Sequence, residues 1–169
     1  VRPGNLSAAT AAGRASSGGV AAPDAVVAAA ERGEEEALLA WLDSGGRVSA
    51  TYERGGVSGV TLLMGAAGSG HERLVELLLR HGAEINLQSR DGDTALARAA
   101  VNNHPAVVLR LLRAGADAAL RSDGGKSALQ LAKEKGHAEC VEAVRTYLGE
   151  VTAARSKAPS AEAGGAGAG

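Results

Sequence analysis

Residues 61–86 read TLLMGAAGSGHERLVELLLRHGAEIN, and much of this stretch returns 33 residues later and then once more. His71, His104 and His137 mark the same point of three successive units. Small, apolar and hydroxyl-bearing positions keep this interval, among them Thr61/Thr94/Ser127, Leu63/Leu96/Leu129, Ala66/Ala99/Ala132 and Val75/Val108/Val141. Agreement of this kind predicts stacked repeats, in which each unit buries its apolar face only against its neighbours. Such chains usually work by presenting a surface to a partner.

The first half of each unit is predicted to be a short helix. Thr61, Thr94 and Ser127 can accept backbone N–H bonds as N-caps. An Ala-rich segment follows each cap, and alanine is the strongest helix former. Gly70 and Gly136 are placed to end this helix, because a residue without Cβ can adopt the left-handed conformation.

The second half of each unit is predicted to be a more apolar helix. In the first complete unit its apolar positions have the spacing of one buried stripe: Leu74, Val75, Leu78 and Leu79. We expect Gly82 and Gly115 to stop the second helices with a positive φ, after which a polar loop leads to the next cap. Each unit is therefore helix, turn, helix and hairpin-like loop.

This unit resembles the ankyrin repeat, which has a 33-residue period and a Thr-Pro-Leu-His start. The similarity includes the Gly-His between the helices, the paired leucines, and the Gly-Ala-Asp/Glu that begins at Gly82 and Gly115. It covers about residues 22–150 and is most specific over 61–148. The chain departs from the pattern where the family has Pro (Leu62, Ala95, Ala128) and His (Met64, Ala97, Gln130). The resemblance implies an all-α, ankyrin-type helix-turn-helix repeat solenoid with hairpin-like loops.

Composition divides the chain into three parts. Residues 1–22 are predicted to be a flexible N-terminal segment, residues 23–155 the array, and residues 156–169 a disordered Ala/Gly tail. The repeats are expected at about 23–57, 58–90, 91–123 and 124–150.

The first and last repeats are predicted to be irregular. In the first, we expect Asp24 to be the N-cap and Gly33 to separate the helices. The interval from Gly45 to Gly82 exceeds the period by four residues, which we place in an exposed loop at 47–60. In the last, Leu148 stands where a glycine is predicted, and the second helix is polar, as expected of a capping repeat.

Charge and cysteine content restrict the partners and the compartment. The formal net charge is −1, so we expect neither nucleic acid nor a membrane surface as a partner. No apolar run approaches the roughly 18 residues of a membrane helix. Cys140 is the single cysteine, which fits a reducing compartment and favours an intracellular, cytoplasmic location. Residues 1–22 are Arg- and Ser-containing and lack acids, so organelle targeting stays open.

Motifs that could carry chemistry are weak. Residues 65–72 have the spacing of a phosphate-binding loop, but His71 and Glu72 replace its lysine and hydroxyl, and no strand is predicted before it. The repeat histidines would lie roughly 10 Å apart, too far to share an ion held at about 2.1 Å, and we interpret them as structural. Cys140 occupies an apolar phase and is predicted to be buried. We therefore expect no catalytic residue, cofactor or metal.

The positions that differ between repeats are the loop tips and the exposed side of the first helices. In ankyrin repeats these positions line the concave face that binds proteins, so the resemblance implies a mixed-charge groove. Tyr and Arg are enriched at binding hot spots, which makes Tyr52 and Arg98 candidate anchors. The candidate partner-binding residues are Tyr52, Glu53, Arg54, Ser69, Arg90, Asp91, Arg98, Asn102, Arg121, Asp123 and Glu134.

We expect a non-catalytic protein–protein interaction module, a scaffold or adaptor that is monomeric by itself and binds another protein. One alternative is the recognition arm or regulatory fragment of a larger multidomain protein or enzyme, which the start at Val1 in place of Met favours. Another is an enzyme acting alone, which would need a pocket with convergent polar groups.

Overall fold

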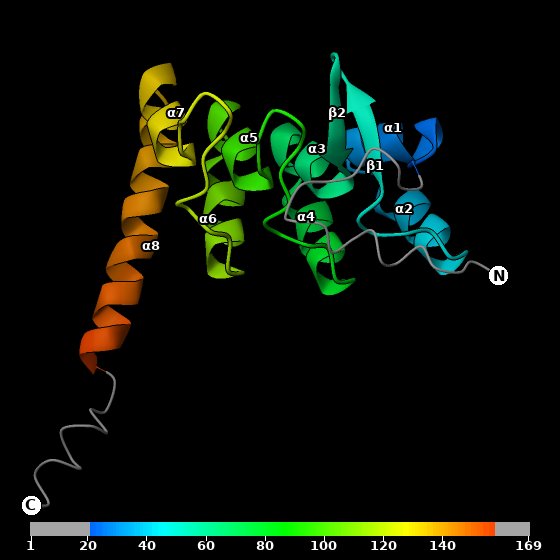
Figure 1. Ribbon diagram of the computed structural model, residues 1–169. Coiled ribbons are helices and arrows are strands. Elements are labelled where there is room, and N and C mark those ends of the chain that lie inside the picture. Colours follow the sequence, from blue (N-terminus) through cyan, green and yellow to red (C-terminus); the bar gives the residue numbers. More distant parts are fainter. Residues whose placement is uncertain (1–20, 158–169) are drawn as a thin grey trace, which may run out of the picture.

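A computed structural model describes residues 21–157 (Figure 1). Residues 1–20 and 158–169, which hold most of the predicted N-terminal segment and tail, lie outside the described residues. The helices are α1 (Asp24–Arg32), α2 (Glu35–Asp43), α3 (Leu62–Ser69), α4 (Glu72–Arg80), α5 (Ala95–Val101), α6 (Pro105–Arg113), α7 (Ala128–Lys135) and α8 (Ala138–Lys157). The strands are β1 (Thr51–Arg54) and β2 (Val57–Thr61).

The helices stack in two layers, and the loops lie on one side of them. In Figure 1 the first helices of the repeats, α1, α3, α5 and α7, share the upper layer with the loops, and α2, α4 and α6 lie below. First helices pack against one another along the stack, α1 on α3, α3 on α5 and α5 on α7. The predicted helical repeat solenoid is confirmed, although the small sheet means that the chain is not purely α.

Side-chain caps start the first helices as predicted. Thr61, Thr94 and Ser127 accept hydrogen bonds from the backbone N–H three residues later, at 3.1, 3.0 and 3.3 Å. At Ser127 the bond is returned, because its own N–H donates to Gln130 Oε1 at 2.8 Å. The first repeat differs from the prediction. Pro23 holds the cap position and Asp24 already lies in the first turn, with no side-chain cap bond.

Left-handed residues end the helices where the sequence predicted glycine. Gly70 and Gly136 have φ of 81° and 75°, and Gly82 and Gly115 have φ of 89° and 103°. In the third repeat Asn103 takes this conformation, with φ of 62°. Asparagine tolerates the left-handed region better than most residues. The 33-residue spacing of the left-handed position is therefore kept although the residue type changes.

The insertion at 47–60 forms a β-hairpin. β1 and β2 pair antiparallel, with Thr51 opposite Thr61, and Gly55 and Gly56 turn the chain with φ of 58° and 82°. A two-residue turn with positive φ at both positions matches the twist of the strands. The prediction of an exposed loop is correct only for the tip. The base of the hairpin is buried, with Val60 0% and Tyr52 9% exposed.

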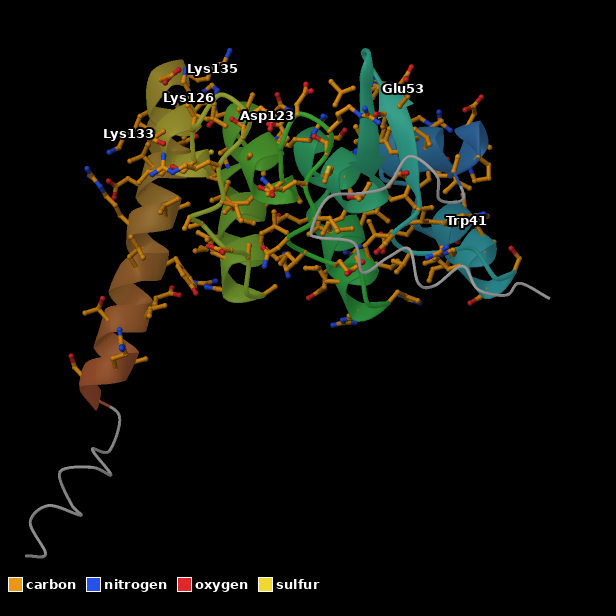
Figure 2. The ribbon with its side chains drawn as sticks, viewed as in Figure 1. Trp41, Glu53, Asp123, Lys126, Lys133 and Lys135 are labelled. Carbon is orange, nitrogen blue, oxygen red and sulfur yellow. The ribbon has the colours of Figure 1, made fainter. Side chains whose placement is uncertain are left out.

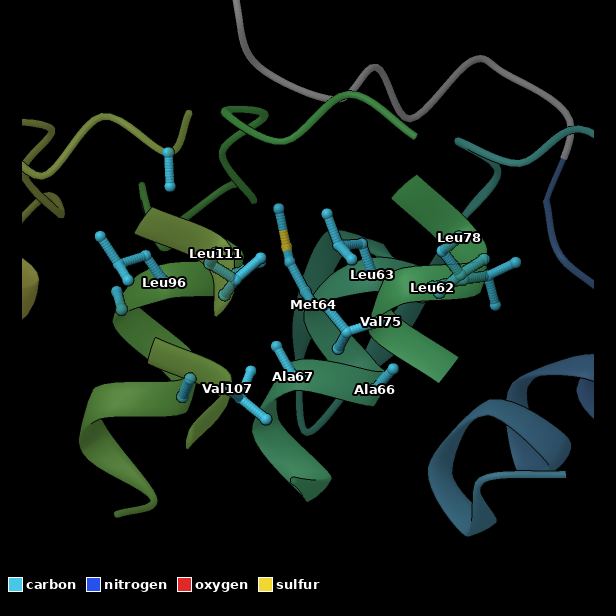
Figure 3. Packing of buried hydrophobic residues seen from close by; sticks show 14 of the residues in the cluster. Leu62, Leu63, Met64, Ala66, Ala67, Val75, Leu78, Leu96, Val107 and Leu111 are labelled. Carbon is cyan, nitrogen blue, oxygen red and sulfur yellow. The ribbon is translucent and has the colours of Figure 1, made fainter. Parts of the chain in front are cut away.

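The core runs through the whole stack as one layer between the helices. Figure 3 shows Leu62 and Met64 of α3, Val75 of α4, Leu96 of α5 and Leu111 of α6, all buried. The alanines of the first helices let neighbouring repeats approach closely. Cys140 is 0% exposed, which confirms the predicted burial.

The last helix is longer than predicted. α8 continues through Leu148 to Lys157, so it includes Ser156, where the tail was expected to begin. Leu148 stands in place of the stop glycine and the helix continues through Gly149, and an ion pair between Arg113 and Glu150 joins its middle to α6. Despite this length, no helix within residues 21–157 is apolar enough over 18 residues to cross a membrane.

Candidate binding surface

The histidines that mark the repeats fasten each unit to the one before it. The Nε2 atoms of His71, His104 and His137 lie 2.7, 3.1 and 3.0 Å from carbonyl oxygens of the preceding repeat, at Glu31, Gly68 and Val101. Nδ1 of His104 comes within 2.6 Å of where a Cβ on Gly70 would lie. These contacts give the histidines the structural role that their spacing predicted.

Backbone hydrogen bonds join the loops of successive repeats into a row. Arg90 N–H donates to Ser58 O at 3.0 Å, and Asp123 N–H donates to Asp91 O at 2.8 Å. Gln88 adds side-chain bonds to Gly92 O and Arg121 O, at 2.9 and 3.0 Å. We call this row, formed by the β1–β2 hairpin and residues 88–93 and 121–126, the loop ridge. These hydrogen bonds connect the parts of the loop ridge to one another.

Most of the predicted partner-binding residues are exposed on the loop ridge or the adjoining first helices. Figure 2 shows Glu53 and Asp123 along this edge, with Trp41 on the opposite layer. The exposed candidates are Glu53, Arg54, Ser69, Arg90, Asp91, Asn102, Arg121, Asp123 and Glu134. That they contact a partner stays a prediction.

Tyr52 does not lie where the sequence placed it. It is 9% exposed, and its hydroxyl reaches the space that a Cβ on Gly65 would fill. The glycine in α3 leaves room for the ring, so the prediction of an exposed anchor is wrong. Burial raises the pKa of Tyr52 to about 12, and the charge of Glu31 adds to this, while Arg98 and Arg54 lower it.

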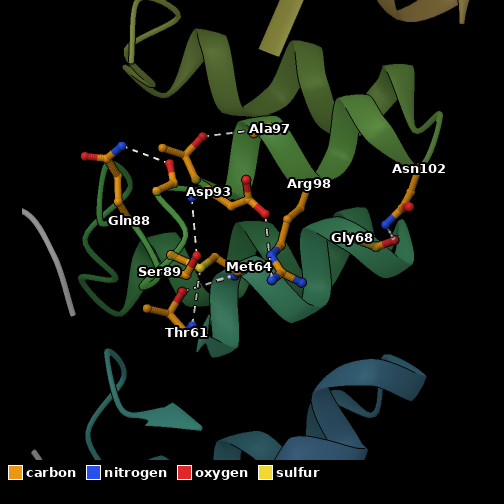
Figure 4. A network of polar contacts seen from close by, with 11 residues as sticks. Thr61, Met64, Gly68, Gln88, Ser89, Asp93, Ala97, Arg98 and Asn102 are labelled. Atoms are coloured by element: carbon orange, nitrogen blue, oxygen red, sulfur yellow. Dashed lines mark hydrogen bonds and ion pairs between the residues drawn. The ribbon is translucent and has the colours of Figure 1, made fainter. Parts of the chain in front are cut away.

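Arg98 lies half-buried on α5 beside an acidic residue that the sequence analysis missed (Figure 4). Its Nη2 is 4.0 Å from Asp93 Oδ2, and its buried Nε has no hydrogen-bond partner among residues 21–157. Burial raises the pKa of Asp93, which the charge of Arg98 opposes. Asn102, the residue that follows α5, donates to Gly68 O at 2.9 Å. The polar residue directly before the Thr94 cap was the one signal that could have drawn attention to Asp93.

In the last repeat, two side chains of α7 are paired with side chains of the loop ridge. Arg121 Nη1 donates to Gln130 Oε1 at 2.8 Å, and Lys126 Nζ lies 2.7 Å from Glu134 Oε1. Glu134 is therefore already neutralised by a lysine from the loop ridge. Lys126 and Gln130 were missed because the equivalent positions of the other repeats hold different residue types.

The opposite layer has a groove between α4 and α6 that the sequence did not reveal. Its volume is about 650 Å³, and Leu79, Ile85 and Leu109 line it. At its edge, Arg110 lies 3.1 Å from Glu76 and 3.5 Å from Glu72. The guanidinium of Arg110 is therefore already paired with two carboxylates.

The glycine-rich segment has the geometry of a helix and not of a phosphate-binding loop. A strand does precede it, contrary to the prediction, because β2 ends at Thr61. Gly65 and Gly68, however, lie inside α3. Within residues 21–157, no group of three or more His, Cys, Asp or Glu side chains could hold a metal ion.

Comparison with protein families matches residues 26–122 to a model described as ankyrin repeats, in three copies. This match covers more than half of the chain. A search of curated proteins with this chain found no match. Ankyrin repeats generally mediate protein–protein interaction.

Proposed function

The chain belongs to the ankyrin-repeat family, and from that premise we propose that it is a non-catalytic scaffold or adaptor that binds a partner protein. The contact surface in this proposal is the loop ridge together with the exposed side of α3, α5 and α7. The partner is another protein, and the array acts as a monomer when it binds.

The fixed geometry of this surface is the observation that carries the proposal. The bonds from Arg90 to Ser58 and from Asp123 to Asp91 hold three loops in one row. A surface that is ordered before binding loses less conformational entropy when the partner arrives. Polar side chains of both charge signs then supply complementarity, which gives specificity more than raw affinity.

The opposite layer fits this role less well. Arg110, Glu72 and Glu76 satisfy one another at the edge of the α4–α6 groove. A partner would have to break these pairs to use their charge, and that costs desolvation without a matching gain.

Surface variants of both layers test the proposal. We expect Ser69→Arg on α3 and Asp91→Arg on the loop ridge to abolish binding of a protein captured by the purified array. Arg73→Glu on α4 is the matched control, since Arg73 is also exposed but lies on the other layer. Affinity is measured by titration calorimetry, and thermal melts check that each variant is folded.

The proposal would be contradicted if Arg73→Glu abolished binding and the other two variants did not. The interface would then lie on the layer that contains α4. Turnover or nucleotide binding by the purified array would contradict the non-catalytic role.

A further inference from the structure

We propose that Tyr52 and Arg98 together bind a carboxylate of the partner protein, the side chain of an Asp or Glu residue. This inference rests on the proposed function, because it names the chemistry that one point of the same face recognises. We call these two residues the donor pair.

The donor pair converges on one turn of α3. Tyr52 reaches the position of Gly65 from the hairpin, and the Cβ of Arg98 lies 3.6 Å from where a Cβ on Gly68 would be. Residues three apart lie on one face of a helix, so both groups cover the same strip of backbone. The charge of Arg98 is close enough to lower the pKa of Tyr52. Two glycines of α3 therefore leave room for the Tyr52 hydroxyl and for the Cβ of Arg98, which come from different repeats.

Both members of the pair have donors to spare. Among the described residues, Tyr52 Oη has no hydrogen-bond partner. This is notable because only 9% of the residue is exposed, and buried polar groups are usually paired. Its pKa of about 12 keeps the hydroxyl protonated at neutral pH, so it can donate. Arg98 makes one ion pair, at 4.0 Å, which is too long for a hydrogen bond. A carboxylate fits this set, because it offers a planar fork to the guanidinium and a lone pair to the hydroxyl.

Asp93 acts as an internal competitor for the guanidinium. Its carboxylate is the one acid paired with Arg98 within residues 21–157, and the pairing is loose. Burial raises the pKa of Asp93, so its charge is poorly solvated where it stands. A partner carboxylate would have to share Arg98 with Asp93 and would be repelled by it. Removing the charge of Asp93 should therefore tighten binding, which a purely structural role for Arg98 does not predict.

Arg110 supplies a matched control. Like Arg98, it is half-buried and has a buried Nε without a hydrogen-bond partner in the described part of the chain. It differs in having two carboxylates, at 3.1 and 3.5 Å, and in lying on the opposite layer. The two arginines thus share local burial and differ in whether their charge is already satisfied.

The experiment is selection of a random-peptide phage library on the purified full chain, followed by calorimetry with the selected peptides. We expect the selected peptides to share an Asp or Glu whose change to Asn or Gln weakens binding. Arg98→Gln should weaken it by roughly tenfold to a hundredfold, as loss of a charged hydrogen bond does. Tyr52→Phe should weaken it by about fivefold, Asp93→Asn should tighten it by roughly two- to tenfold, and Arg110→Gln should leave it unchanged.

A second variant guards against misfolding. Arg98→Lys keeps the charge and the stem but loses the fork, so it should also weaken binding while the thermal melt stays close to that of the wild type. Selected peptides that bind the Arg98 and Asp93 variants as they bind the wild type would overturn the donor pair. If Ser69→Arg still abolishes their binding, the proposed function survives that result.

Two further outcomes separate the alternatives. Tighter binding when phosphoserine replaces the selected Asp or Glu would show a phosphate reader and overturn the carboxylate assignment. A selection that yields no binding peptide at all would count against both the donor pair and the proposed function.

Discussion

The contacts between a histidine and a left-handed glycine show how single residues set the spacing of this molecule. His104 bonds to Gly68 O and its ring covers Gly70. A Cβ at the corresponding Gly136 of the last repeat would have no neighbouring atom of residues 21–157 within 4 Å. The sequence predicted the phase of these residues because they recur. It could not predict that Tyr52 fills the space over Gly65, since that contact occurs once and joins segments from different repeats.

The two glycines offer a paired test of this close approach. Gly136→Ala should lower the free energy of unfolding by about 1–2 kcal/mol, the cost of a Cβ in the left-handed region. Gly70→Ala has the same backbone cost and in addition places a Cβ 2.6 Å from His104 Nδ1, so it should cost distinctly more. Urea unfolding of both variants measures the difference. Equal losses would show that the histidine can move aside without cost.

At the scale of the element, recurrence again separates what the sequence could predict from what it could not. The three N-caps follow from one aligned column, and the structure confirms each of them. The β1–β2 hairpin comes from an insertion present in one repeat, so no second copy was there to define its phase. α8 continues past Leu148 and Gly149 and makes the tertiary Arg113–Glu150 ion pair, neither of which the repeat pattern contains.

The caps differ in burial, and their energetic weight should follow. Thr94 is 5% exposed, whereas the Ser127 side chain bonds to Gln130 N at an exposed position. Thr94→Ala would leave a buried N–H without a partner and should cost about 2 kcal/mol. Ser127→Ala should cost about 1 kcal/mol or less, because water can replace the lost bond. Thermal and urea melts of the two variants would contradict this order if Ser127→Ala proved the more damaging.

For the whole molecule, the apolar positions that recur between repeats predicted the core well. They predicted the candidate binding surface less well. The stripe at Leu74, Val75 and Leu78 is buried as expected, and Leu79 lies half-buried at its edge. Apart from Tyr52, the candidate residues of the loop tips were correctly placed at the surface by their variation between repeats. Asp93 was missed as the ion-pair partner of Arg98, because the equivalent positions of the other repeats hold Val60 and Lys126 and show no common pattern.

One change made at two leucines tests the assignment of core and surface. Leu111 is 0% exposed and Leu148 is 51% exposed. Leu111→Ala should cost about 2–5 kcal/mol through lost burial and the cavity that remains. Leu148→Ala should stay within about 0.5 kcal/mol, as is usual at the surface. Similar losses in equilibrium urea unfolding would mean that α8 has a buried contact at Leu148.

The bonds between neighbouring repeats also decide how the chain would respond to a mechanical load. The histidine bonds to Glu31, Gly68 and Val101 span 40, 36 and 36 positions, so each reaches one unit back and no further. Force applied to the two ends would act on these fastenings in series. We expect the stack to lengthen by the release of one unit at a time, because each bond joins only two neighbouring repeats. A partner bound at the proposed surface would then lose its contacts in steps as successive loops separate.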